Sequence, residues 1–246
     1  MNIAYIDIET SPVLGYTWGK YRQDVLSVEK DFFVMCFAVK WNDSKKIETY
    51  SLPDFKTYQK DHEDDRELMA KMWEILDKAD IVCAHNGDKF DIRKINARLI
   101  SLGFSPPSPY LTIDTLKVAR KYFKFTSNKL DDLGALLGVG RKIHTGGFKL
   151  WRDCMLGDER SWAIMARYNA QDVRLLYDVY MKLRPWMRNH PNVNDDLSYR
   201  KCPNCGSTRI QSRGQDRSKS GVYRRYKCTG CGSWHKGKTI EISDIK

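Results

Sequence analysis

Two acidic residues interrupt an otherwise apolar stretch near the start of the chain. The segment reads YIDIET, and its acids are Asp7 and Glu9. Side chains alternate across a β-strand, so these carboxylates share one face, about 7 Å apart along the backbone. An unpaired carboxylate in a dry site is costly, and a second one beside it adds repulsion. We therefore expect a source of positive charge next to this pair.

Two later positions also carry acids that an apolar pattern does not predict. Asp91 ends the segment HNGDKFD, just after a short apolar strand and at the start of a helix. Tyr168 and Asp172 are four residues apart in YNAQD, which places them on one face of a helix. Each acid alone has a structural alternative: a helix N-cap for Asp91, a surface ion pair for Asp172 and a strand end for Glu9.

A second group of residues with metal-binding chemistry lies near the C-terminus. Two C-x-x-C pairs are separated by 22 residues, and their members are Cys202, Cys205, Cys228 and Cys231. Without an indication of export, metal ligation is favoured over disulfides. Each pair can give two thiolates to one tetrahedral zinc, the pattern of a closed structural site. The segment resembles a zinc ribbon that holds one Zn²⁺.

Positive charge is concentrated around these cysteines. The chain of 246 residues has a net charge of +11, of which residues 200–246 contribute +9 through 12 basic and 3 acidic residues. A compact basic module suggests a polyanionic partner, most often nucleic acid. We expect the ribbon to bind nucleic acid, with Arg213, Arg224 and Arg225 among its contacts. The alternatives are a solubilising tail and a ribbon that docks protein.

The apolar pattern predicts the elements that position these residues. Runs of Ile, Val, Phe and Tyr bounded by turn residues predict strands over residues 2–8, 31–41, 45–52, 80–84 and 110–114. Helical spacing predicts helices over residues 65–79, 90–103, 115–123, 129–137 and 159–187. Three consecutive strands followed by strands that alternate with helices predict an α/β fold with a mixed sheet.

Composition also predicts the domain organisation and the compartment. We expect a catalytic domain over residues 1–188, a polar linker over 189–200 and the ribbon over 201–246. Apolar residues make up 41% of the chain and charged residues 30%, as in globular proteins. No run of 18 apolar residues and no basic region followed by an apolar one is present, so we expect no membrane span or secretory signal. The expected compartment is the cytoplasm.

The order and type of the acids resemble the DEDD superfamily of 3′→5′ exonucleases, in its DnaQ-like, tyrosine-bearing (DEDDy) variant. The matching residues are Asp7 and Glu9 in DIE, Asn86, Phe90 and Asp91 in NGDKFD, and Tyr168 and Asp172 in the family's Tyr-x-x-x-Asp. The similarity spans residues 3–187 and is greatest to stand-alone phage proteins related to the proofreading domain of family B DNA polymerases. It implies an RNase H-like fold, a mixed five-stranded sheet flanked by helices.

The resemblance also implies a two-metal mechanism. Two Mg²⁺ or Mn²⁺ ions about 3.5–4 Å apart ionise the attacking water and neutralise the leaving oxygen. Asp7 is the implied bridging ligand, Glu9 and Asp172 hold the ion on the nucleophile side, and Asp91 completes the site. A free phenol titrates near pH 10, so we expect Tyr168 to orient the water and not to act as its base.

Further residues are expected to contact the substrate. By the same resemblance, Thr10 lines the pocket of the terminal nucleotide, and Asn86 and Phe90 lie beside the penultimate one. Core packing is the alternative for Phe90. The segment HTGGFKLWR combines glycines, aromatics and basic residues and is suited to a loop that tracks a backbone, with Lys149 and Arg152 as contacts. An ordinary connector is the alternative for this segment.

The leading expectation is a metal-dependent 3′→5′ exonuclease acting on DNA, with single-stranded or frayed ends favoured. Three alternatives stay open: a 3′→5′ exoribonuclease, a structure-specific endonuclease, and a nucleic-acid-binding protein without catalysis. The intact set of Asp7, Glu9, Asp91, Tyr168 and Asp172 argues against the last. A replication or recombination protein is a possible partner that the sequence does not identify, and the similarity to phage proteins would make the compartment the host cytoplasm.

Overall fold

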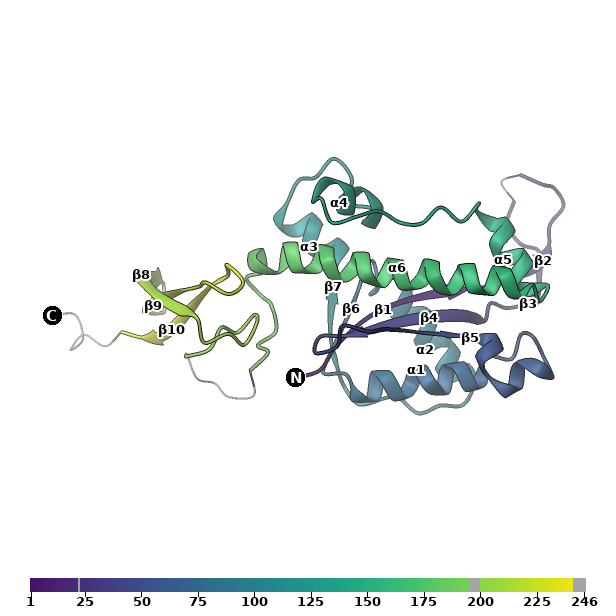
Figure 1. The fold of residues 1–246 in the computed structure, drawn as a ribbon, viewed down its shortest axis with the longest axis horizontal. Helices are drawn as coiled ribbons and strands as arrows, with labels where there is room; N and C mark the ends of the chain where they lie inside the picture. Colours follow the sequence, from purple (N-terminus) through teal and green to yellow (C-terminus); the bar gives the residue numbers. More distant parts are fainter. Residues whose placement is uncertain (22, 195–199, 241–246) are drawn as a thin grey trace.

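A mixed five-stranded sheet forms the centre of the molecule (Figure 1). The computed structural model describes residues 1–21, 23–194 and 200–240. The strand order is β5-β4-β1-β6-β7, and the strands are β1 (Ile3–Thr10), β4 (Val34–Trp41), β5 (Ile47–Ser51), β6 (Ile81–Ala84) and β7 (Leu111–Asp114). β1 pairs antiparallel with β4 and parallel with β6. The predicted mixed five-stranded sheet is therefore confirmed.

Helices cover both faces of this sheet. They are α1 (Arg66–Lys78), α2 (Asp91–Ser101), α3 (Thr115–Tyr122), α4 (Leu130–Leu136), α5 (Phe148–Met155) and α6 (Glu159–Leu183). Figure 1 shows α1 and α2 on one side of the sheet and α6 on the other. Because both faces are covered, the central strand reads as a nearly continuous apolar run.

The alternation of side chains along β1 decides which face carries the acids. Ile6 and Ile8 belong to the apolar cluster that contains α1 and α2. Tyr5 belongs to the cluster that contains much of α6 and contacts the ring of Tyr180. Residues at odd positions in β1 share the face of Tyr5. The acids at positions 7 and 9 are therefore directed toward α6.

Two predicted segments differ from the structure in ways that have a local cause. The segment HTGGFKLWR is not a loop throughout, because α5 begins at Phe148 directly after Gly147, whose φ is 74°. Leu150 and Cys154 are buried one turn apart and hold this helix against the core. The long final helix ends at Leu183 instead of Met187, since Pro185 falls in the short 3-10 helix η3 (Arg184–Trp186).

A two-stranded hairpin also has no counterpart among the predictions. β2 (Leu14–Tyr16) and β3 (Ser27–Lys30) form a two-stranded antiparallel hairpin beyond the end of β1. Most of its residues are exposed, so no alternation of apolar and polar residues marked it as a pair of strands.

A separate three-stranded sheet lies beyond the C-terminal end of α6 (Figure 1). Its strands are β8 (Ile210–Ser218), β9 (Gly221–Cys228) and β10 (Trp234–Thr239), in the order β10-β9-β8. Asn204 is buried and donates hydrogen bonds to the carbonyl oxygens of Arg184 (3.3 Å) and Met187 (3.4 Å), which ties the first cysteine pair to the end of the α6 region. Residues 195–199 of the predicted linker and 241–246 of the predicted ribbon lie outside the described residues.

No helix within the described ranges is both long and apolar enough to cross a bilayer.

Candidate active site

Carboxylates from β1 and α6 converge at the centre of the sheet. Asp7 and Glu9 come from β1 and Asp172 comes from α6, and one carboxylate oxygen of each lies within 4.8 Å of the others. Asp172 is fully buried, and the two β1 acids are partly buried. Packing of α6 across the odd-numbered face of β1 produces this cluster, which we call the acidic cluster.

Asp91 lies next to the acidic cluster, at the start of α2, but is not one of its three members. It is the first residue of α2, is 3% exposed, and its Oδ1 accepts a hydrogen bond from the backbone N–H of Ile8 at 3.2 Å. Phe90 is the N-cap of α2, so Asp91 does not take the N-cap position. Its side chain instead reaches the strand that carries Asp7.

Burial and mutual repulsion favour the protonated forms of these acids. Burial, then the charges of Asp91 and Glu9, raise the pKa of Asp7 well above its usual range. Burial and the Asp172 charge raise the pKa of Glu9 to about 8. Burial raises the pKa of Asp91 to about 7. The ionised cluster therefore requires additional positive charge, as two acids on one apolar strand suggest.

Lys142 supplies one positive charge, and no sequence pattern singled it out. Its Nζ lies 2.6 Å from Asp172 Oδ2 and 3.4 Å from the Tyr168 hydroxyl. Burial opposes its protonation, but the charge of Asp172 and the hydrogen bond to it give a net rise in the pKa of Lys142. Lys142 follows a surface arginine in the connection between α4 and α5, so only tertiary packing reveals its position.

Asn169 is a second site residue. It lies within the segment YNAQD, but it was not identified from the sequence. Its Nδ2 donates to Asp7 Oδ2 at 2.7 Å and to the Asp7 carbonyl at 3.2 Å. It lies three residues before Asp172 on α6, so both side chains face β1. The spacing within YNAQD was the available signal.

The oxygen atoms of the cluster fit hard divalent cations. Among the described residues, Asp172 Oδ1 and Asn169 Oδ1 are buried and have no hydrogen-bond partner. Unpaired buried acceptors are rare in folded proteins, and a bound ion is one explanation for them. Carboxylate oxygens are preferred ligands of Mg²⁺ and Mn²⁺. Asp7, Glu9, Asp91 and Asp172 are thus suited to hold such ions.

Tyr168 lies one turn before Asp172 at the edge of the cluster. Its ring contacts Trp151 edge to face at 6.1 Å between centroids. Burial, then the charges of Asp172 and Glu9, raise the pKa of Tyr168 above its ordinary value. The phenol therefore stays protonated at neutral pH and can hold a water molecule, but it is a poor base.

The predicted substrate contacts near β1 lie where the backbone is irregular. Thr10 follows a register shift in the pairing of β1 with β4, between Glu9 and Thr10. Asn86 has a φ of 66°, a left-handed conformation, and its N–H donates to Asp114 Oδ1 at 2.9 Å. Such bulges and strained residues are frequent beside functional sites. The ring of Phe90 is 41% exposed, which disfavours core packing as its role.

The basic residues predicted on the 144–152 segment lie on α5. Lys149 and Arg152 are exposed, and each forms an ion pair with Asp153. Arg152 Nη2 lies 3.3 Å from Asp153 Oδ1. Their charge is therefore partly neutralised by a neighbour on the same helix. Arg213, Arg224 and Arg225 lie on β8 and β9 of the C-terminal sheet, apart from the acidic cluster.

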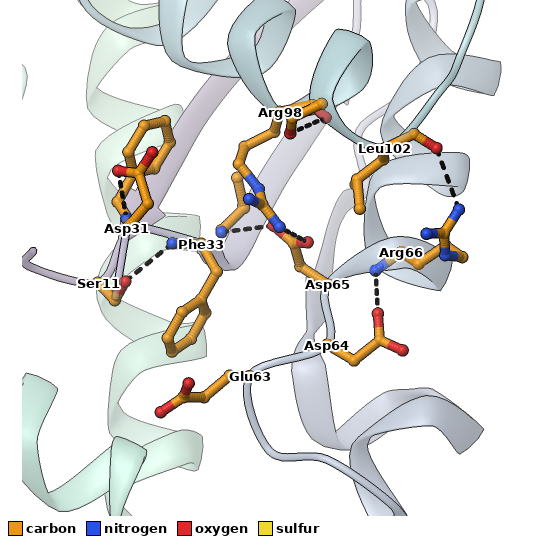
Figure 2. Close-up of polar contacts among 12 residues, drawn as sticks. Ser11, Asp31, Phe33, Glu63, Asp64, Asp65, Arg66, Arg98 and Leu102 are labelled. Atoms are coloured by element: carbon orange, nitrogen blue, oxygen red, sulfur yellow. Dashed lines mark hydrogen bonds and ion pairs between the residues drawn. The ribbon is translucent and has the colours of Figure 1, made fainter. Parts of the chain in front are cut away.

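A buried ion pair fixes the chain just beyond the acids of β1 (Figure 2). Ser11 exchanges hydrogen bonds with the backbone of Phe33, whose neighbour Val34 donates its N–H to Asp65 Oδ2 at 2.8 Å. Asp65 is fully buried and receives two hydrogen bonds from Arg98 of α2, at 2.9 and 2.5 Å. Asp65 therefore joins three elements, namely β4, the start of α1, and α2. The last of these, α2, carries Asp91.

The four C-terminal cysteines form a second group with the geometry of a metal site. All four Sγ atoms lie within 4.8 Å of one another, and Cys202–Cys231 and Cys205–Cys228 are each 3.7 Å apart. Zn–S bonds of about 2.3 Å in a tetrahedron place the sulfurs about 3.8 Å apart. The cysteines are compatible with a zinc ribbon.

Comparisons with known proteins agree with this architecture. Residues 4–184 match a family model described as the RNase_H superfamily. No curated protein matches the chain significantly. Among solved structures, the chain is similar to a family B DNA polymerase from the hyperthermophilic archaeon Pyrobaculum calidifontis, with 18% identity and a TM-score of 0.56 over 75% of this chain. The chain spans 25% of the length of that polymerase, and at 18% identity the similarity concerns the fold alone.

Proposed function

Because the chain belongs to the RNase H superfamily through residues 4–184, we propose that it is a metal-dependent 3′→5′ exonuclease that hydrolyses phosphodiester bonds at DNA 3′ ends. Membership in this superfamily supports nuclease activity on nucleic acid. The 3′→5′ polarity and the preference for DNA go beyond superfamily membership and are part of our proposal. They are supported by the tyrosine-type motif and by its resemblance to proofreading domains of family B DNA polymerases.

The observation that carries the proposal is the acidic cluster with its tyrosine. Asp7, Glu9 and Asp172 place carboxylate oxygens within 4.8 Å of one another, and Tyr168 precedes Asp172 by one helical turn. Three converging acids with raised pKa values, and Asp91 beside them with its pKa also raised, are unfavourable in a purely structural site. They become favourable where divalent cations and a substrate phosphate share the site.

Each residue has a defined role in the proposed reaction. Asp7, Glu9, Asp91 and Asp172 would hold two Mg²⁺ or Mn²⁺ ions. When bound, these ions supply the charge that ionises the attacking water and neutralises the leaving oxygen. Asn169 orients the Asp7 carboxylate through its 2.7 Å hydrogen bond. The protonated Tyr168 hydroxyl holds the water in line with the phosphorus.

We assign the terminal nucleotides of the substrate to the surface next to β1. Thr10 would contact the terminal nucleotide, and the exposed ring of Phe90 would lie against the penultimate one, beside Asn86. An aromatic face can stack on any base, so this contact favours an unpaired end without reading its sequence. Single-stranded or frayed ends are therefore the proposed substrates. Lys149 and Arg152 of α5 are proposed as more distant backbone contacts.

The deciding experiment uses DNA and RNA of matched sequence, labelled at the 5′ end, with free or blocked 3′ ends and with Mg²⁺, Mn²⁺ or neither. We expect a descending ladder on DNA that vanishes when the 3′ end is blocked. Asp172→Asn should abolish the ladder, and Asp178→Asn, on the same helix but outside the acidic cluster, should retain it.

Other product patterns would identify the alternatives. Internal cuts in blocked DNA would indicate an endonuclease. Faster degradation of RNA than of DNA would indicate an exoribonuclease. Binding without cleavage under every metal condition would leave a nucleic-acid-binding protein without catalysis.

A further inference from the structure

The C-terminal sheet has two chemically different faces. In the pairing of β10 with β9, Trp234 lies opposite Lys227, and Lys236 lies opposite Arg225. Directly opposed residues of an antiparallel pair project from the same face. Arg225, Lys227, Trp234 and Lys236 therefore form one surface, which we call the Trp234 face.

A half-exposed indole ring with two cations over it lies at the end of the Trp234 face where β10 begins. Trp234 is 50% exposed. The Arg225 guanidinium lies 5.1 Å from the centroid of its ring, and Lys227 Nζ lies 5.8 Å from it. Arg225 is held in place because its Nε donates to the Arg213 carbonyl at 3.0 Å. The ring and the charges are thus positioned before any ligand binds.

The opposite face is already occupied by contacts within the sheet. His235 lies opposite Tyr226, and their rings stack with centroids 5.5 Å apart and planes 19° from parallel. Gly237 packs so closely on Tyr226 that an added Cβ would lie 2.4 Å from its ring. Arg224 is exposed and precedes Arg225 in β9, so strand alternation places it on this face.

The Trp234 face has the chemistry of a site for an unpaired nucleic-acid strand. Cations that follow a backbone, combined with an aromatic ring on which a base stacks, are the usual means of binding single strands. A duplex keeps its bases stacked on one another and would not use the exposed face of Trp234. Asp216 pairs with Lys236 at 3.4 Å, and within residues 200–240 neither Arg225 nor Lys227 forms an ion pair with an acid.

We propose that the Trp234 face binds single-stranded DNA, with a base stacked on Trp234 and phosphates contacted by Arg225 and Lys227. The proposal rests on the proposed function, because the bound strand is the substrate whose 3′ end enters the acidic cluster. The twelve residues of α6 from Asp172 to Leu183 span eleven helical rises, about 16 Å, and the C-terminal sheet follows their end. The face therefore contacts nucleotides upstream of the 3′ end, and only longer substrates reach it.

The test measures binding in the full-length, zinc-containing chain. Asp7→Asn in all samples and buffer without added Mg²⁺ or Mn²⁺ prevent cleavage. The probe is a fluorescent oligothymidylate of about 30 nucleotides, and its anisotropy is followed over a range of salt concentrations. Zinc content, measured by atomic absorption, verifies that each variant retains the folded ribbon.

The two faces predict different responses. Trp234→Ala should weaken binding by about 5- to 150-fold, the range for loss of one base stack, and Trp234→Phe should weaken it less. Arg225→Ala should reduce the slope of log affinity against log salt by about 0.7. Although the sequence groups Arg224 with the other expected contacts, the register directs it away from Trp234, so Arg224→Ala removes the same charge from the opposite face and should leave the slope unchanged. If Trp234→Ala loses zinc, Trp234→Leu gives the deciding comparison, because it keeps apolar volume without an aromatic face.

Several results would overturn the proposal. They are wild-type affinity in a zinc-containing Trp234→Ala or Trp234→Leu variant, equal effects of Arg224→Ala and Arg225→Ala, and tighter binding of duplex DNA or of RNA than of the single DNA strand. Hydrolysis of a substrate of about 3 nucleotides tests the nuclease separately, because its length of about 10 Å at about 3.4 Å per nucleotide is shorter than the α6 span to the C-terminal sheet. Face-dependent binding without hydrolysis would refute the exonuclease alone, and hydrolysis without face-dependent binding would refute the Trp234 face alone.

Discussion

Lys142 Nζ lies 2.6 Å from Asp172 Oδ2, so a loop lysine forms an ion pair with a fully buried carboxylate of the acidic cluster. The two residues are separated by 30 positions in the sequence. The pair places one fixed positive charge where the proposed divalent cations would also bind. Lys142 therefore stabilises the cation-free cluster and repels the cations.

Removing this lysine should have opposite effects on the two states. Lys142→Met should lower the free energy of unfolding without Mg²⁺ by an amount between about 1 kcal/mol for an exposed pair and about 3–5 kcal/mol for a buried one. It should also increase the stabilisation that added Mg²⁺ gives, because one repulsive charge is lost. Thermal unfolding with and without Mg²⁺ measures both effects. Arg141→Ala, which removes a surface pair with Asp131, is the control. If the stabilisation by Mg²⁺ were the same in Lys142→Met and in wild type, Lys142 would not repel the cations.

The orienting role of Tyr168 predicts a graded loss of rate. Tyr168→Phe keeps the ring against Trp151 and removes only the hydroxyl, so hydrolysis should slow by about 100-fold. Asp7→Ala and Asp172→Ala remove predicted metal ligands and should slow it much more. Single-turnover rates on a short 5′-labelled strand, with circular dichroism as a check of folding, give the comparison. Complete loss of activity in folded Tyr168→Phe would argue against an orienting role.

The raised pKa values predict a specific dependence of stability on pH. Burial, followed by the Asp172 charge, raises the pKa of Glu9 from 4.5 to about 8, so the folded state binds this proton more tightly than the unfolded state does. Its contribution to stability is present below pH 4.5 and is lost as the pH rises to about 8. Urea unfolding at pH 5 and pH 8.5 should show this loss in wild type without Mg²⁺ and a smaller one in Glu9→Gln. Equal pH dependence in both proteins would exclude Glu9 as its source.

The same protons should leave when divalent cations bind, because a carboxyl must be ionised to act as a ligand. Titration calorimetry with Mg²⁺ at pH 7 in two buffers of different ionisation enthalpy should report proton release from wild type. Glu9→Gln should release fewer protons. A heat of binding that is independent of the buffer would show that the acidic cluster is already ionised.

The buried pair between Asp65 and Arg98 should matter for folding more than any surface pair. Asp65→Asn leaves Arg98 without its counter-charge and should lower the free energy of unfolding by about 3–5 kcal/mol. Glu63→Gln, which removes a surface pair with Lys30, should lower it by at most about 1 kcal/mol. Urea unfolding monitored by circular dichroism gives both values. Similar effects of the two substitutions would show that the Figure 2 network does not support the fold.

Loss of the proposed zinc should affect DNA binding more than the chemistry. Cys202→Ser with Cys228→Ser removes one thiolate from each C-x-x-C pair, and we expect zinc content to fall from one equivalent to about zero. Binding to a long strand should weaken and its salt dependence should flatten, whereas slow cleavage of short substrates should persist. Cys83→Ser changes a buried cysteine of the central sheet and should retain zinc. Salt dependence that survives the loss of zinc would separate the ribbon from DNA binding.

Features with a local physical signature could be predicted from the sequence. The mixed sheet follows from apolar runs at strand and helix periodicity, and Asp7 and Glu9 stand out because every other residue of β1 before Thr10 is apolar and buried. The C-x-x-C spacing identifies a cysteine cluster because two residues between thiols suit one metal. The β2–β3 hairpin and α5 were missed because exposed strands and a helix after two glycines lack such a signature.

The tertiary structure decided which distant residues share the site and which face of a strand each occupies. Asn169 contacts Asp7 across 162 positions, and Lys142 reaches Asp172 from a loop without a recognisable pattern. The C-terminal register separated Arg225 from Arg224, which the sequence had grouped by charge alone. The physical reason is that sequence periodicity reports how each element buries its own apolar face, whereas these contacts depend on how α6 packs on β1 and how β10 aligns with β9.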